Sequence, residues 1–222
     1  LSILFQLIFN ARIINNWKFN FPIIDRETVT QTIFILVCVL FLLFNVKIEG
    51  FFSNFLFLND KSAILCKGLV VVISLAISGI LLQSFTLQKL NFFEYFNLFL
   101  LSIFSLLLLI SSSDLISLYL LIEMQALCFY VLATFKKNSA FSTEAGLKYF
   151  ILGSFISGFF LFGASLIYGC LGTLNLSNLN LLLAFPFSTF NDELRYIVLI
   201  GIIFVTATLL FKIACAPFHF WA

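Results

Sequence analysis

The sequence predicts an all-α polytopic membrane protein, folded as a bundle of six or seven transmembrane helices. Of its 222 residues, 62% are hydrophobic and only 10% are charged, whereas a typical soluble domain is about a quarter charged. Several apolar runs reach the ~20 residues that cross a bilayer as a helix. Helices are the expected form of each span because they satisfy their backbone hydrogen bonds internally, as lipid requires.

Six apolar runs are long enough to be spans. They cover residues 29–46, 63–83, 95–111, 114–135, 145–170 and 195–217. An earlier run, residues 3–14, is short and interrupted by polar residues, so it is either the tail of a seventh span or an interfacial segment. Residues 171–194 are expected to form a loop. Pro217 is expected to disturb the last helix because proline removes a backbone donor from the hydrogen-bond ladder.

The charged residues of the loops predict an orientation. Lys136 and Lys137 lie between the fourth and fifth spans, whereas Asp192 and Glu193 lie before the sixth. Because positively charged loops tend to stay on the cytoplasmic side, residues 136–144 are expected on that side, which corresponds to the matrix in a mitochondrion.

Several functional classes are excluded by composition. A net charge of +2 and the absence of a basic stripe argue against nucleic acid as a partner. The five cysteines form no CxxC motif, so they read as free thiols without a metal or a disulfide. A single histidine excludes haem ligation by two histidines of this chain. No nucleotide-binding loop or nucleophile–histidine–acid set is present, so no catalytic site of its own is expected, and the chain would act by moving protons or ions or by structural support.

Glu123 is a carboxylate in the middle of an apolar run, LYLLIEMQALCFYVLA. It follows Asp114 by nine residues, which places it ~13 Å into the helix. An acid at this depth costs at least ~2.5 kcal/mol unless it faces protein or water. Two interpretations remain: a structural carboxylate held by a neighbouring helix, or a group that relays protons or ions.

Three further residues are candidates for the same chemistry. Lys148 follows Glu144 by four residues, so it is either an interfacial lysine paired with Glu144 or a relay group. Lys212 lies five residues before Pro217; it is either an interfacial lysine or part of a site at a broken helix, as in transporters. His219, the only histidine, is a proton shuttle or a packing residue. In a buried carboxylate–lysine pair, burial lowers the lysine pKa and the nearby carboxylate raises it. The distance between the two groups therefore controls whether the lysine holds or releases its proton.

Two local patterns predict capping and packing. Asp114, which ends the run SSSD, is expected to cap the fourth span with its side chain. Small residues in the fifth span are expected to let a neighbouring helix approach closely. They are Gly153, Ser154, Ser157, Gly158, Gly163 and Ala164.

Two stretches carry a resemblance to a known family. Residues 111–176, which begin SSSDLISLYLLIEMQALCFYVLATFKKNS, resemble subunit 2 of respiratory NADH:ubiquinone oxidoreductase (complex I), an antiporter-like membrane subunit. Residues 209–222, LLFKIACAPFHFWA, look like the broken-helix motif of the same family. Over residues 1–110 the likeness is one of hydropathy more than of motif. The resemblance therefore covers the first half of such a subunit.

The resemblance implies roles for individual positions. Glu123 matches the mid-membrane glutamate of the family, and Lys212 matches the lysine that pairs with it. Lys148 matches a further lysine of the proton path, and His219 matches the histidine of the PFH motif. The span that carries Lys212 is implied to be discontinuous near Pro217.

The resemblance also implies the organisation and context of the chain. Residues 1–222 would form a single membrane domain, in which leading helices (1–94) precede an incomplete first antiporter-like repeat (95–222). The implied function is proton translocation coupled to electron transfer from NADH to ubiquinone, as a non-redox subunit of the enzyme. NADH, FMN, iron–sulfur clusters and ubiquinone would be used elsewhere in the complex.

The implied partners are other membrane-arm subunits, membrane lipids and a chain that supplies the missing C-terminal half, because the sequence ends abruptly within the broken helix. The expected location is the mitochondrial inner membrane rather than a bacterial one. The abundance of Phe, 32 residues, points the same way because it suggests an AT-rich genome. Two alternatives remain open: a cation/proton antiporter subunit, and a degenerate half-subunit that serves assembly of the membrane arm.

Overall fold

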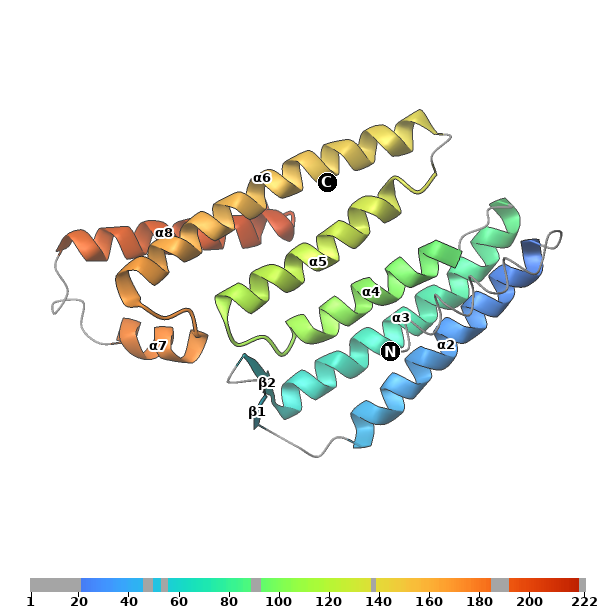
Figure 1. Cartoon of the computed structure of the whole chain (residues 1–222), viewed down its shortest axis with the longest axis horizontal. Coiled ribbons are helices and arrows are strands. Elements are labelled where there is room, and N and C mark those ends of the chain that lie inside the picture. Colours follow the sequence, from blue (N-terminus) through green and yellow to red (C-terminus); the bar gives the residue numbers. More distant parts are fainter. Residues whose placement is uncertain are drawn as a thin grey trace. The chain divides into compact units, whose positions relative to one another are not determined.

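Helices account for nearly all of the chain that the structure describes, namely residues 21–45, 50–52, 56–88, 93–136, 139–184 and 192–219. In this computed structural model the helices follow one another as shown in Figure 1. They are α2 (Phe21–Asn45), α3 (Lys61–Gln88), α4 (Phe93–Leu109), α5 (Leu115–Ala133), α6 (Ala140–Leu171), α7 (Leu176–Ala184) and α8 (Asp192–Lys212). Two compact units result: the first comprises α2, α3 and α4, and the second comprises α5 to α8 with residues 51–52 and 56–58.

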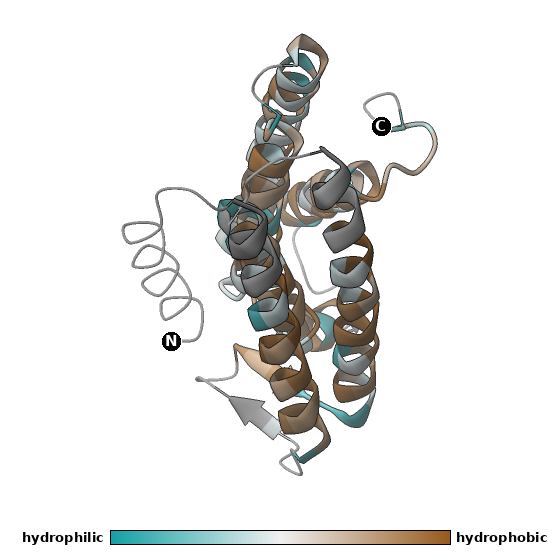
Figure 2. Ribbon diagram, turned by 90° about the vertical axis from the view of Figure 1, so that its right-hand side faces the viewer, coloured by the Kyte–Doolittle hydropathy of each residue, from teal (hydrophilic) through white to brown (hydrophobic). Residues whose placement is uncertain are grey.

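The prediction of an all-α polytopic membrane protein is confirmed. Helices α2, α3, α5, α6 and α8 are each long and apolar enough to cross a membrane, and α4 is a shorter apolar helix. Brown, hydrophobic residues run along most of their length in Figure 2. Large apolar side chains such as Phe34, Phe41 and Phe155 are more than half exposed. In water such a surface would aggregate, but in lipid it faces a matching solvent. The expected segment 3–14 lies outside the described residues.

The first unit packs around a small apolar core that is lined by hydroxyl groups. Leu36, Val71, Leu100 and Ile103 are buried together. Beside them four buried serines each donate a hydrogen bond to the carbonyl three residues earlier in their own helix, at 2.7–2.8 Å. Because these hydroxyls are satisfied locally, small serines can lie between helices without an unpaired donor. The four are Ser74, Ser78, Ser102 and Ser105.

In the second unit α6 is the central helix and packs against both α5 and α8. It begins at the N-cap Ser139, whose hydroxyl accepts a hydrogen bond from the Ser142 amide. It ends at Gly172, which has a φ of 71° and donates its amide to the Tyr168 carbonyl at 2.8 Å. Glycine suits this left-handed position because it has no Cβ.

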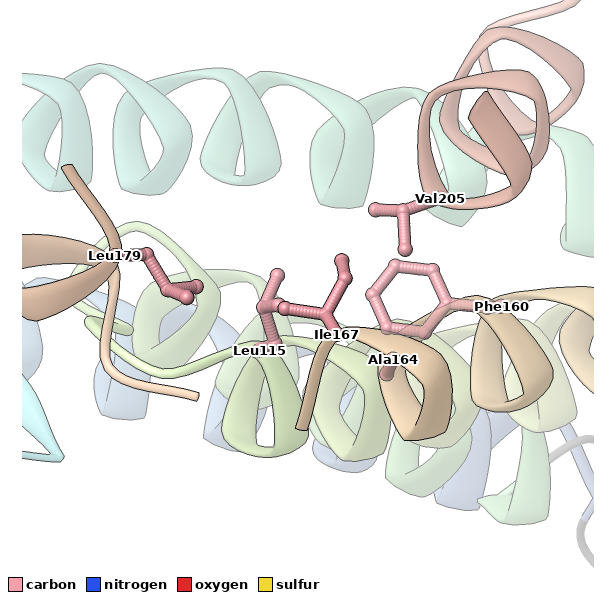
Figure 3. Packing of buried hydrophobic residues seen from close by; sticks show 6 residues of the cluster. All are labelled: Leu115, Phe160, Ala164, Ile167, Leu179 and Val205. Carbon is pink, nitrogen blue, oxygen red and sulfur yellow. The ribbon is translucent and has the colours of Figure 1, made fainter. Parts of the chain in front are cut away.

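The core of the second unit joins four helices and is drawn in Figure 3. Phe160, Ala164 and Ile167 of α6 pack with Leu115 of α5 and Val205 of α8. Leu179 of α7 completes this cluster. The short helix α7 therefore contributes to the core, although residues 171–194 were expected to be a loop. That prediction was wrong because a nine-residue helix is too short to give a spanning signal.

Backbone pairing fixes the start of α5. Leu115 donates its amide to Leu174, and Leu176 donates to Ser113, at 3.1 and 2.9 Å. On the other side Ser113 donates to Leu56 at 2.9 Å. Strand β2 (Phe57–Asn59), which pairs with β1 (Gly50–Phe52), lies at this place. These short strands were not predicted.

Asp114 occupies the N-cap position of α5, as expected, with φ −119° and ψ 146°. The expected side-chain capping bond is absent, however. Ser117 instead donates its hydroxyl to the Asp114 carbonyl oxygen at 2.9 Å. The first turn of the helix is thus held by a serine within it, and the backbone pairing described above supplies the remaining restraint.

Candidate functional site

Glu123 and Lys212 face each other across the second unit. Glu123 is the ninth residue of the nineteen in α5, and Lys212 is the last residue of α8. Their charged atoms, Lys212 Nζ and Glu123 Oε2, are 4.0 Å apart. The side chains are only 23% and 20% exposed. At 4.0 Å the contact is an ion pair rather than a direct hydrogen bond, so the two groups attract each other but remain separable.

The end of α8 places the lysine. Cys215 donates its amide to Leu210 at 3.1 Å, and Ala214 donates to Phe211 at 3.0 Å. Together with the φ of 56° at Ala214, these two bonds form a Schellman motif. The helix therefore stops at Lys212, five residues before Pro217. A cation in the last turn of a helix is favoured by the helix dipole.

A small cavity lies beside the ion pair, among the helices α5, α6 and α8. Its volume is about 10 Å³, close to the space that one water molecule needs. Glu123 and Lys212 line it together with seven other residues from α5, α6 and α8. These are Tyr119, Ile122, Ile156, Ser157, Phe160, Thr208 and Leu209.

Three of the lining residues carry a hydroxyl group, namely Tyr119, Ser157 and Thr208, and two of these hydroxyls have hydrogen bonds within their own helix. Ser157 is 8% exposed and donates its hydrogen to the Ser154 carbonyl at 2.7 Å. Thr208 is 4% exposed and donates to the Val205 carbonyl at 2.7 Å. Each oxygen keeps its lone pairs, so both hydroxyls are available as acceptors. The Glu123 atom Oε2 is buried and has no hydrogen-bond partner among the described residues.

Sequence reasoning had assigned Ser157 only to packing, and it had not singled out Thr208. Hydroxyl side chains in apolar helices are common, so neither position stands out locally. The one available signal is spacing. Thr208 lies four residues before Lys212, and therefore on the same face of α8.

Lys148 lies elsewhere on α6. Its ammonium contacts the Glu144 carboxylate at 2.6 Å, which confirms the pairing expected from their four-residue spacing. Both side chains are exposed, at 70% and 62%. Lys148 precedes Ser157 by nine residues, which places it on the opposite face of the helix at 100° per residue. Lys148 is thus not brought to the Glu123–Lys212 cavity, and its relay role stays a prediction.

His219 and Pro217 lie in the turns that follow α8. Phe218 donates its amide to the Cys215 carbonyl at 2.7 Å, and its ring lies 6.4 Å from that of Phe211. His219 is exposed. The helix does not continue from Lys212 to His219, so the two residues are not stacked two turns apart on one face. The roles of His219 and Pro217 stay predictions.

The geometry therefore supplies an acid in the middle of α5 and a base at the end of α8, beside a water-sized cavity. A carboxylate and an amine at 4.0 Å can each hold or release a proton, and a cavity water can carry it between them. This arrangement fits proton transfer.

Two relatives with named functions are similar to this chain in sequence. NADH-ubiquinone oxidoreductase chain 2 of Marchantia polymorpha is 44% identical over 73% of this chain and 33% of its own length. NADH-quinone oxidoreductase subunit N of Paramagnetospirillum magneticum is 41% identical over 76% of this chain and 34% of its own length. The chain thus spans about a third of the length of these relatives.

A solved structure shares the fold. A chain of respiratory complex I from Thermus thermophilus superposes with a TM-score of 0.70 over all of this chain and 46% of its own length, at 24% identity. The membrane-bound sulfane sulfur reductase, an archaeal respiratory membrane complex, gives 0.71 over all of this chain and 45% of its own, at 21% identity. Residues 112–222, which carry the Glu123–Lys212 pair, match the family described as NADH:quinone oxidoreductase/Mrp antiporter, transmembrane, and the chain belongs to that family.

Proposed function

We propose that this chain is a proton-translocating part of the membrane arm of respiratory NADH–quinone oxidoreductase (complex I). The observation that carries the proposal is the Glu123–Lys212 pair, 4.0 Å apart on two helices that are long and apolar enough to cross a membrane. Placing such charges in a membrane costs folding free energy, and a role in moving protons accounts for that cost. The relatives named as subunits of this oxidoreductase support the same function.

In the proposed mechanism the separation of the two charges controls one proton. While Lys212 and Glu123 are close, each stabilises the charged form of the other. A movement that widens the gap beyond 4.0 Å removes this attraction, and the lysine then gives its proton to water in the cavity. Electron transfer elsewhere in the complex supplies the movement by favouring one of the two arrangements. Lys148 and His219 are proposed as further stations of the path.

The proposed partners are the other membrane-arm subunits and the lipids around them. The chain matches about a third of its relatives' length, and we propose a further partner that supplies the C-terminal half of the transport unit. We assign NADH, FMN, iron–sulfur clusters and ubiquinone to other subunits. The proposed location is the mitochondrial inner membrane, which the plant relatives favour and the bacterial relatives leave open. Fractionation of mitochondria, followed by detection of this chain, tests the location.

The function is tested by Glu123→Gln in the assembled complex, reconstituted in vesicles. We expect NADH oxidation to translocate far fewer protons per electron, because the neutral amide cannot take up a proton. Glu144→Gln is the matched control, since that carboxylate is exposed at the other side of α6 and paired with Lys148. Full proton translocation in an assembled Glu123→Gln complex would refute the proposal.

A second candidate is a cation/proton antiporter subunit, which the family description also covers. Such a subunit would exchange sodium for protons without NADH and would not co-purify with flavin and iron–sulfur subunits. Purification under mild conditions and ion-exchange measurements in vesicles separate the two. A role in assembly alone would appear as fewer complexes after Lys212→Met, with unchanged proton translocation in each complex.

A further inference from the structure

Tyr130 of α5 carries a buried hydroxyl that its packing does not explain. The residue is 4% exposed, and its oxygen has no hydrogen-bond partner among the described residues. Its ring is held edge-on by the ring of Tyr149, with centroids 4.6 Å apart at 87°. A phenylalanine would fill the same space without a buried polar atom. Because an unpaired hydroxyl is costly away from water, its presence points to a partner such as a bound water.

This hydroxyl lies on the same face of α5 as Glu123. The two residues are seven positions apart, which is two helical turns, or about 10 Å along the axis. Helical side chains lean toward the N-terminus of their helix, so the Tyr130 ring leans toward Glu123. The Glu123 oxygen Oε2 is also buried and lacks a hydrogen-bond partner among the described residues.

Gly153 of α6 marks where the Tyr130 oxygen lies. A Cβ atom at this glycine would overlap the hydroxyl and stand 2.8 Å from the ring carbon that bears it. Ser157, which lines the Glu123–Lys212 cavity, is four residues further on the same face of α6. One turn of helix is about 5.4 Å. Two consecutive hydrogen bonds of about 2.8 Å through a single water span that length.

On the side away from Glu123, Tyr130 lies near the C-terminal end of α5 and the N-terminal end of α6. Thr134, four residues later, donates its hydroxyl to the Tyr130 carbonyl at 3.2 Å. Its methyl group lies against Gly146 of α6. Beyond these residues α5 ends at Ala133 and α6 begins at Ala140. Tyr130 is therefore placed between the membrane edge at this turn and the cavity that holds Glu123.

We propose that the Tyr130 hydroxyl is a relay station that passes protons between this membrane edge and Glu123; this inference rests on the proposed function. The Tyr130 oxygen accepts a proton from a water on the Thr134 side, and that water regains a proton from the solution at the membrane edge. At the same time its own proton leaves to a water beside Ser157, which in turn protonates the Glu123 carboxylate. Tyr130 is neutral before and after the step, because a hydroxyl both donates and accepts. The net change is one proton moved to Glu123.

Tyr130→Phe in the assembled complex tests the relay, because it removes only the oxygen and keeps the ring against Tyr149. Proton translocation and NADH oxidation are measured per assembled complex, normalised to flavin content, in water and in deuterium oxide. We expect a several-fold loss of translocated protons and a changed solvent isotope effect. Tyr168→Phe, at an exposed position of α6, is the matched control and is expected to change neither quantity.

A merely structural hydroxyl gives a different result. Tyr130→Phe would then leave translocation and its isotope effect unchanged while raising thermal stability, since a buried unpaired oxygen is lost; that outcome overturns the relay. Glu123→Gln separates this inference from the proposed function. If Glu123→Gln stops translocation and Tyr130→Phe does not alter it, the relay fails and the function stands. If Glu123→Gln has no effect, the proposed function fails as well.

Discussion

Gly163 of α6 and Gly201 of α8 lie against each other with no room for a side chain on either. A Cβ atom at Gly163 would stand 2.8 Å from the Gly201 carbonyl oxygen, and one at Gly201 would stand 2.9 Å from the Gly163 carbonyl oxygen. The two backbones meet directly, as small residues allow in membrane helices. This crossing holds α8 close to α6, and Lys212 lies three turns further along α8. The distance from Lys212 to Glu123 therefore depends on a contact between two glycines.

Gly163→Ala or Gly201→Ala is expected to push the helices apart. The added methyl group meets backbone that cannot yield, so we expect a loss of roughly 1–3 kcal/mol of stability and weaker proton translocation. Thermal unfolding of the solubilised protein and translocation assays measure the two effects. Gly158→Ala is the control because a Cβ there meets nothing within 4 Å. Equal stabilities for Gly163→Ala and Gly158→Ala would contradict the tight crossing.

Gly153→Ala is expected to destabilise the protein through Tyr130. The new methyl group overlaps the Tyr130 hydroxyl, which is confined between Tyr149 and Phe150 by ring contacts. Tyr130→Phe removes the overlapping oxygen and should restore part of the lost stability. The recovery is only partial because the ring carbon still lies 2.8 Å from the new methyl group. A double-mutant cycle in thermal unfolding measures this coupling. Additive effects would show that the two residues do not touch.

Ala214→Gly is expected to raise stability. Ala214 has a φ of 56°. In that left-handed region a residue with a Cβ atom costs about 1 kcal/mol of folding free energy, whereas glycine adopts it with little strain. The change leaves the hydrogen bonds of the Schellman motif in place, so Lys212 should keep its position and translocation should persist. Ala216→Gly, outside the left-handed region, should bring no such gain in melting temperature. A gain at Ala216 equal to that at Ala214 would argue against the motif.

Lysine substitutions should separate the two basic residues by function. Lys212→Met removes the partner of Glu123 and is expected to stop most proton translocation. Lys148→Met breaks only an exposed pair with Glu144, so stability should hardly change. If Lys148 also takes part in the proton path, Lys148→Met lowers proton translocation, whereas Glu144→Gln leaves proton translocation unchanged. Matching translocation in the Lys148→Met and wild-type complexes would remove Lys148 from the path.

Local patterns predicted the helices well because hydropathy is a property of each segment by itself. Each predicted span corresponds to a helix, and Glu123 lies in the middle of α5. The Glu144–Lys148 pair and the close approach at Gly163 were also predicted, since both follow from spacing or residue size within one helix. The predictions were wrong at short elements. The helix α7 and the two strands carry too few residues to give a periodic signal.

Composition and spacing by themselves determined that this chain is a helical membrane protein with one costly carboxylate at mid-depth. The sequence of α8 did not reveal that the helix ends at Lys212, because that end depends on the left-handed conformation of Ala214. Only the tertiary structure decided which groups surround Glu123. Lys212 lies 89 residues away in sequence, and Ser157 reaches the cavity through the packing of α6 against α5. The physical reason is that periodicity encodes how each helix meets lipid or protein, whereas the partner of a buried charge is chosen by how helices cross.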